Sequence, residues 1–169
     1  DKAATVYVDA LNAIGRTTEK NKNDSEAMSN FEKARAVGLS TMKRSPLNTT
    51  MMRFLAMTHE NIARLNRRQG ELPKAVKNHH LALKLRTELV TRAPENQRWL
   101  SDKAVSFHQL AITLADQGEI QRALAFANKD LAIVTTLYET TPSSSERHKN
   151  LAISQSLLAQ LEMRSKAYD

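Results

Sequence analysis

A repeat of about 48 residues runs through the chain and restricts its fold more than any other feature. When the 169-residue sequence is shifted by this period, Pro46, Pro94 and Pro142 coincide, and so do Gly70 and Gly118. Small and apolar residues keep the same register: Ala56, Ala104 and Ala152; Ile62, Leu110 and Leu158; Leu89 and Leu137. The chain therefore holds three repeats and half of a fourth, over residues 1–45, 46–93, 94–141 and 142–169.

Each repeat has the pattern of two helices. Apolar residues recur at helical spacing in two stretches, for example Val105, Leu110, Ala111 and Leu114, followed by Ala123, Ala127, Leu131, Val134 and Leu137. Gly70 and Gly118 stand between the stretches, where a chain reversal needs a residue that adopts positive φ without a Cβ clash. Ala75 and Ala123 follow these turns and should be buried, because a larger side chain would hold the helix axes apart. The pattern predicts an all-α chain of about seven antiparallel helices joined by short turns.

Two junctions carry more detailed predictions. The prolines mark the boundaries between repeats, because proline is tolerated in the first turn of a helix and not inside one. Ser143 and Glu146 have the spacing of a capping box at the start of the last helix. In the first repeat Lys22 replaces the turn glycine, and we expect three of its neighbours to supply the turn instead, namely Asn21, Asn23 and Asp24.

The segments FHQLAITLADQGEIQRALAFANKDLAI and HENIARLNRRQGELPKAVKNHHLALKL resemble the tetratricopeptide repeat (TPR) family, and the resemblance covers nearly the whole chain. The family's Leu-small pair matches Leu110-Ala111, its turn glycine matches Gly118, and its small residue early in the second helix matches Ala123. The period of about 48 exceeds the family's usual period of about 34, so we expect longer helices. The resemblance implies one TPR-like domain over residues 1–169, built as a right-handed superhelical solenoid with a concave groove.

The resemblance also sets an expectation for the two ends of the chain. Asp1 falls within or just before a first helix, and the sequence stops where a second helix should begin. We therefore expect a piece of a longer protein, similar to the repeat arrays attached to bacterial signalling proteins. The apolar residues of the last helix should be partly exposed or covered by another copy of the molecule, which would allow self-association: Leu151, Leu157, Leu158 and Leu161.

Patterns typical of catalytic, metal and cofactor sites are missing from the sequence. There is no cysteine and no glycine-rich phosphate loop, and no histidine has a second histidine or a carboxylate at the i+4 spacing of a helical zinc pair. No apolar run approaches the roughly 20 residues that span a bilayer, and the start has no apolar centre of a secretory signal. We expect a non-enzymatic segment without metal or cofactor, in the cytoplasm and without a membrane partner.

Positive charge is concentrated in the second repeat. The formal net charge is +7, and residues 46–93 hold 9 Lys and Arg against 3 Asp and Glu, whereas residues 94–141 hold 4 against 6. By the family resemblance, the first helix of each repeat lines the groove at Asn12, Arg16, Glu19, Glu60, Asn61, Arg64, Arg67, Arg68, His108, Gln109, Ile112, Ser156, Gln160 and Arg164. Guanidinium groups bind carboxylates through two donors, and asparagine can bond a peptide backbone.

These positions predict a protein or peptide ligand, acidic in character, held on the concave surface. We expect the peptide-binding residues to be Asn12, Arg16, Asn61, Arg64, Arg67, Arg68, His108 and Gln109.

Three alternatives to a groove that binds an acidic peptide stay open at this point. A basic helix face is commonly just solvated. Helical repeats can also bind nucleic acid, but reading one base per repeat needs recurring side chains at equivalent places, and the aligned residues Asn12, Glu60, His108 and Ser156 differ. The third is a module whose repeat ends associate with another copy.

Overall fold

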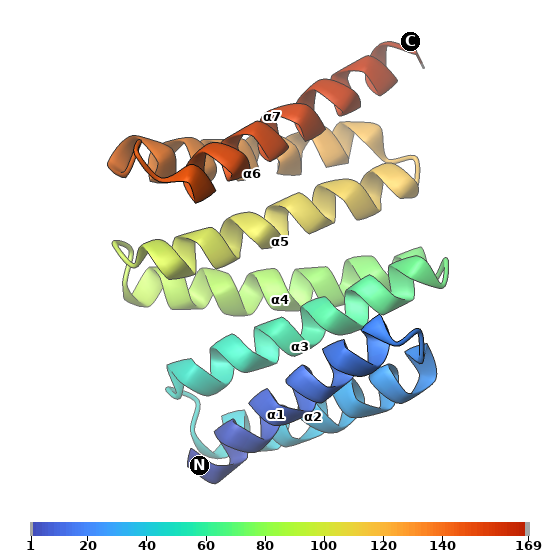
Figure 1. The fold of residues 1–169 in the computed structure, drawn as a ribbon, viewed down its shortest axis with the longest axis vertical. Helices are drawn as coiled ribbons and strands as arrows, with labels where there is room; N and C mark the ends of the chain where they lie inside the picture. Colours follow the sequence, from blue (N-terminus) through green and yellow to red (C-terminus); the bar gives the residue numbers. More distant parts are fainter. Residues whose placement is uncertain (1, 168–169) are drawn as a thin grey trace. The chain divides into compact units, whose positions relative to one another are not determined.

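The computed structural model describes residues 2–167, and over that range it consists of seven α-helices with no strand (Figure 1). Each helix has 19 to 22 residues, as the long period requires. The helices are α1 (Lys2–Lys20), α2 (Asp24–Arg44), α3 (Thr49–Arg68), α4 (Leu72–Arg92), α5 (Gln97–Asp116), α6 (Ile120–Thr140) and α7 (Ser145–Lys166). The predicted all-α architecture of helix-turn-helix repeats is confirmed.

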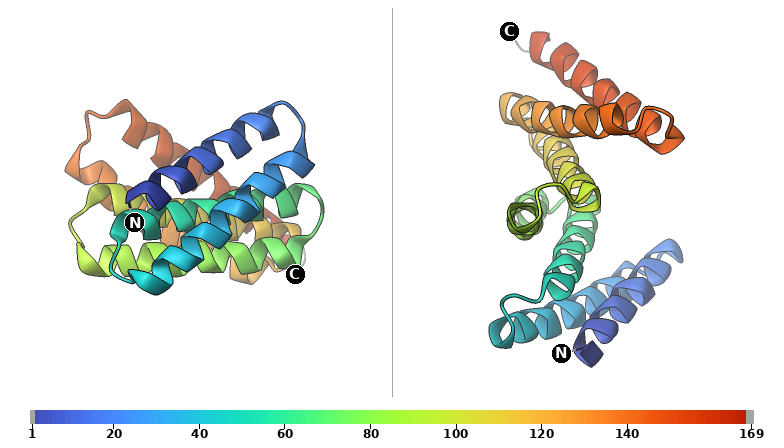
Figure 2. Two further views of the ribbon diagram at one scale, coloured as in Figure 1. Left: turned by 90° about the horizontal axis from the view of Figure 1, so that it is seen from below. Right: turned by 90° about the vertical axis from the view of Figure 1, so that its left-hand side faces the viewer.

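The chain divides into two compact units near the end of the second repeat, within the last turn of α4, with unit I over residues 1–89 and unit II over residues 90–169. In unit I, α1 packs against α2 and α3, and α2 packs against α3, with α1 and α2 forming an antiparallel pair (Figure 2). Buried polar contacts join α4 to α3. In unit II, α6 packs against both α5 and α7. The right-handed superhelix expected for the whole chain stays a prediction.

The turns inside the repeats use one backbone conformation. Gly70 and Gly118 have positive φ values of 77° and 82°, as predicted. Lys22 stands at the same place with φ 62°, so the lysine itself takes the left-handed conformation. The expectation that its neighbours would supply the turn is wrong on this point. Asn23 serves instead as the N-cap of α2, where its side chain accepts a hydrogen bond from the Glu26 N–H.

The junctions between repeats are also equivalent. Asn48, Asn96 and Ser144 are the N-caps of α3, α5 and α7, each with a side-chain oxygen that accepts from a backbone N–H three residues on. The predicted capping box is therefore wrong by one position, because Ser144 rather than Ser143 is the cap and Arg147 stands three residues later. Each boundary proline lies in the turn two residues before its cap, not in the first turn of a helix.

Close packing of the helices depends on small residues. Ala75 and Ala123 are fully buried, which confirms their predicted place at helix contacts. Gly15 lies against the ring of the fully buried Phe31, and a Cβ at this position would overlap the ring atoms.

The expectation for the leucines of α7 is only partly met. Leu151, Leu157 and Leu158 are half-buried, as expected. Leu161 is buried instead, because it packs inward beneath the groove between α5 and α7.

Candidate functional site

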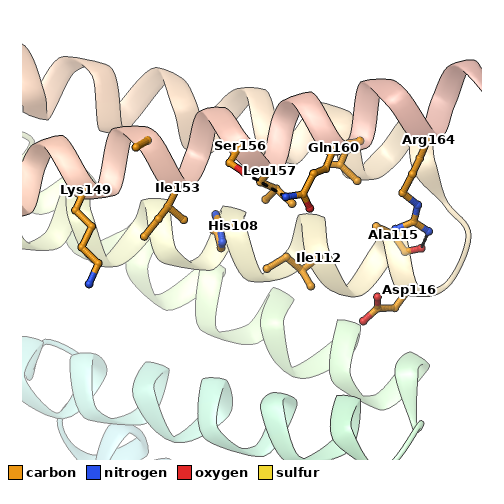
Figure 3. A pocket seen from close by; sticks show the side chains of 12 residues that line it. His108, Ile112, Ala115, Asp116, Lys149, Ile153, Ser156, Leu157, Gln160 and Arg164 are labelled. Carbon is orange, nitrogen blue, oxygen red and sulfur yellow. Dashed lines mark hydrogen bonds between the residues drawn. The ribbon is translucent and has the colours of Figure 1, made fainter.

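A groove of about 580 Å³ lies in unit II between α5 and α7 (Figure 3). Figure 3 shows that side chains of both helices border the same space. Its apolar lining comes from Ile112 and Ala115 on α5 and from Ala152, Ile153, Leu157 and Leu161 on α7. We call this surface the α5–α7 groove.

The groove has an apolar middle and charged ends. Ile153 is 44% exposed, although isoleucine is a residue that usually lies in the core. Lys149 lies at one end, and Asp116 and Arg164 lie at the other (Figure 3). Lys149 has no ion-pair partner within residues 2–167. The Arg164 guanidinium donates to the Ala115 carbonyl oxygen at 2.7 Å, which ties the end of α7 to the end of α5.

A polar network holds His108, which lines this groove. Asp130 on α6 is buried and accepts two hydrogen bonds, from His108 Nδ1 at 2.9 Å and from Ser154 Oγ at 2.8 Å. The serine hydroxyl thus donates its hydrogen bond to the aspartate and not to the histidine. In a catalytic triad the serine hydroxyl is hydrogen-bonded to the histidine, which removes its proton. This arrangement therefore orients His108 without activating Ser154 as a nucleophile.

The equivalent surface of unit I is charged. A smaller groove of about 320 Å³ is lined by Arg16, Glu19 and Lys20 from α1 and by Arg64 and Arg68 from α3. We call it the α1–α3 groove.

Ion pairs cross the α1–α3 groove. Glu19 accepts from Arg64 through both carboxylate oxygens, one of them at 2.9 Å from Nε, and it lies 3.3 Å from Arg68. The hydrogen bond from Arg64 lowers the pKa of Glu19 further than partial burial raises it, and the charges of Arg64 and Arg68 add to the lowering. Arg68 also pairs with Asp24 at 2.5 Å. Two of the predicted peptide-binding residues, Arg64 and Arg68, are therefore already bound to carboxylates of this chain.

The two predicted backbone ligands are structural in this conformation. Asn12 and Asn61 are 0% and 2% exposed. Asn12 donates to Thr58 Oγ1 at 2.8 Å, and Asn61 donates to Asn12 Oδ1 at 3.2 Å. Arg64 donates to Asn61 Oδ1 at 3.2 Å, so the asparagines position the arginine instead of facing a ligand.

The predicted site residues thus fall into two places. The structure brings Asn12, Arg16, Asn61, Arg64 and Arg68 together beside α1 and α3. Arg67 is half-buried and does not line that groove. His108 and Gln109 lie on α5 in unit II, half-buried, with His108 in the α5–α7 groove.

Sequence reasoning missed five groove residues on α7, namely Lys149, Ala152, Ile153, Leu157 and Leu161. A signal was present in the repeat register, because Leu157 aligns with Gln109 and so places an apolar side chain at an expected groove position.

No protein-family model matches the chain, and no curated protein is significantly similar to it. Among residues 2–167, no group of three or more His, Asp or Glu side chains is placed to hold a metal ion. None of the described helices combines the length and the apolar character needed to cross a membrane.

Proposed function

We propose that this chain is a non-catalytic, TPR-like interaction module that binds a segment of a partner protein in the α5–α7 groove. The observation that carries the proposal is an open apolar groove between two helices, with Ile153 and Ile112 beside it and an unpaired lysine at one end. Ligand sites are typically concave and mostly apolar, with a few polar groups that fix orientation.

The residues of the groove define the segment that it fits. Ile112, Ile153 and Leu157 would contact apolar side chains of the segment. Lys149 would pair with a carboxylate at one end. Ser156 lies beside Leu157 and Gln160 lies between Leu157 and Arg164, and their hydroxyl and amide groups can bond the peptide backbone (Figure 3).

Selection from a random-peptide phage library tests the proposal. We expect enriched peptides that carry apolar residues and an acidic residue. Replacing Ile153 with Glu should weaken their binding about tenfold or more, because it places a charge in the apolar middle of the groove. Ile153 is partly exposed, so this change should leave the fold intact.

Met163→Glu is the matched control. Met163 lies on the same helix and is 66% exposed, but it does not line the groove. The control variant should bind the selected peptides as the wild type does. Equal losses in both variants, or no enrichment of any peptide, would contradict the proposal.

The α1–α3 groove is a second candidate site for an acidic segment. Arg16 and Lys20 line it and have no carboxylate partner in the described part of the chain, so positive charge remains after the Glu19 pairs are counted. In this proposal Arg16 is the anchor, since Arg64 and Arg68 would have to leave Glu19 and Asp24 to bind a ligand. Arg16→Glu should weaken an acidic peptide bound there without affecting peptides selected on the α5–α7 groove.

A further inference from the structure

A third cavity, of about 530 Å³, lies in unit I between α2 and α4 and has residues of α3 in its lining. We call it the α2–α4 pocket. The amides of Asn66 and Asn78 and the apolar side chain of Ile62 line it, together with the cationic residues Arg35, Lys74 and Lys77. It is separate from the α1–α3 groove, with which it shares no lining residue.

Comparison with the third repeat shows that an apolar set can replace the polar residues of this pocket. In the repeat register, His59, Asn66 and Asn78 correspond to Phe107, Leu114 and Phe126 of the next repeat. There the two phenylalanine rings pack with centroids 5.9 Å apart, and Leu114 is fully buried. The same fold therefore accepts an entirely apolar set at these three positions. The second repeat has polar side chains where packing does not require them.

Two of these polar side chains satisfy each other. Asn78 Nδ2 donates to the Lys74 carbonyl oxygen at 3.0 Å, which leaves its Oδ1 as the acceptor facing His59 Nδ1 at 2.9 Å. His59 Nδ1 therefore carries the proton. This hydrogen bond holds Asn78 in the pocket wall and gives the buried His59 a polar partner.

Asn66 has no such internal partner. It is 5% exposed, and its side-chain amide makes no hydrogen bond with any residue in 2–167. Its amide atoms are not sealed off from solvent and line the pocket, so a polar ligand there can replace water as their hydrogen-bond partner. An unpartnered amide that lines a cavity is what a site for a polar ligand requires.

The charges at the rim indicate the chemistry of that ligand. Arg35 pairs with Glu32, and Lys74 pairs with Glu71 at 2.8 Å. Lys77 is exposed and has no ion pair over the described range, so one positive charge at the rim is not neutralised. Ile62 and Leu81 add apolar surface beside it.

We propose that the α2–α4 pocket binds a carboxylate carried on an apolar body, with Lys77 supplying the positive charge and Asn66 Nδ2 the hydrogen bond. One unpaired cation and one amide donor match a single carboxylate, and the apolar wall accommodates the body of the ligand.

An NMR titration with N-acetyl-leucine tests the pocket directly. The reporters are the side-chain amide signals of Asn66 and the δ1 methyl signal of Ile62. Both should shift with N-acetyl-leucine and stay unchanged with N-acetyl-leucinamide, in which a neutral carboxamide replaces the carboxylate. Equal shifts with both compounds, or no shift with either, would overturn the proposal.

Variants taken from the third repeat sharpen this test. Asn66→Leu and Lys77→Ala install the residues found at Leu114 and Ala125, and each should weaken N-acetyl-leucine binding about tenfold. Lys84→Ala is the control: it installs the residue found at Ala132 and removes an exposed lysine of α4 that does not line the pocket.

Binding by the control should equal that of the wild type, and an equal loss in Lys77→Ala and Lys84→Ala would reduce the effect to overall charge and refute the site. If Asn66→Leu does not fold, the comparison of Lys77→Ala with Lys84→Ala still tests the site.

A short peptide with a C-terminal leucine separates two sources of the carboxylate. Tighter binding than N-acetyl-leucine assigns the pocket to a protein C-terminus, and weaker binding assigns it to a small acid. Neither result depends on the α5–α7 groove.

Discussion

Lys22 holds the left-handed backbone conformation that glycine holds at Gly70 and Gly118. This conformation brings the Cβ of an L-residue too close to the backbone, at a cost of about 1–2 kcal/mol, which glycine avoids. Replacing Lys22 with Gly should therefore raise the free energy of unfolding by about 1 kcal/mol, after allowing for the greater freedom of glycine in the unfolded chain. Urea unfolding followed by circular dichroism measures the change.

The reciprocal variant is Gly118→Lys. No atom lies within 4 Å of a Cβ built at Gly118, so its expected loss of stability is conformational and not steric. Changes in the free energy of unfolding that are opposite in sign and similar in size in the two variants support this explanation. A destabilised Lys22→Gly variant would contradict it.

Gly15 is needed for space, not for its backbone freedom. Alanine is the better helix former by about 1 kcal/mol, and the aligned residues Ala63 and Ala111 show that the fold accepts it elsewhere. At Gly15, however, a Cβ would overlap the buried Phe31 ring, so Gly15→Ala should destabilise the protein by about 1–3 kcal/mol. The cost should be smaller when Phe31 is also changed to Leu. Equal costs in both backgrounds, measured by urea unfolding, would exclude the steric explanation.

At the scale of elements, α3 and α4 are joined by buried polar pairs. Glu60 is buried against Arg86 and His79. Burial by itself raises the pKa of Glu60, but Arg86 and His79 together lower it overall, so the carboxylate stays charged. Such pairs stabilise less than apolar packing but are costly to break singly.

The His59–Asn78 pair makes this contact sensitive to pH. Burial lowers the pKa of His59 below its ordinary value of 6.5, the Asn78 hydrogen bond opposes the shift, and Arg35 adds to it. The unfolded chain thus binds this proton at a higher pH than the folded chain. The free energy of unfolding should therefore fall as the pH drops below about 6.5.

The double variant His59→Phe with Asn78→Phe tests this dependence. It copies the Phe107–Phe126 pair and should lose less stability between about pH 7 and pH 5.5 than the wild type. His148→Gln, which removes an exposed histidine of α7, should retain the wild-type dependence. Urea unfolding at the two pH values measures it, and identical pH dependence in the double variant and the wild type would disprove the role of His59.

At the scale of the whole molecule, charge separates the two units. Residues 1–89 contain 16 Lys and Arg against 9 Asp and Glu, whereas residues 90–169 contain 9 of each kind. The net positive charge thus belongs to unit I, which has the α1–α3 groove and the α2–α4 pocket. The neutral unit II has the apolar groove. The two units are therefore suited to different ligand chemistries.

The sequence predicts the helices and turns because their determinants are periodic. Turn glycines, capping residues and small residues recur about every 48 residues, so identifying one turn locates the equivalent turns in the other repeats. The site was harder to predict, because groove positions tell which way a side chain faces and not which neighbour it meets. Glu19 was expected in the groove, but its pairing with Arg64 across α1 and α3 depends on side-chain length and geometry. The burial of Asn12 likewise depends on Thr58, 46 residues away.

Methyl NMR tests most directly the central claim that unit II binds a peptide between α5 and α7. The chain has six isoleucines, of which Ile112 and Ile153 line the α5–α7 groove and Ile62 lines the α2–α4 pocket. With δ1 methyl groups labelled, addition of a library-selected peptide should shift Ile112 and Ile153 and leave Ile14 and Ile62 in place. Shifts at Ile14 or Ile62 without shifts at Ile112 and Ile153 would place the binding surface in unit I and contradict the claim.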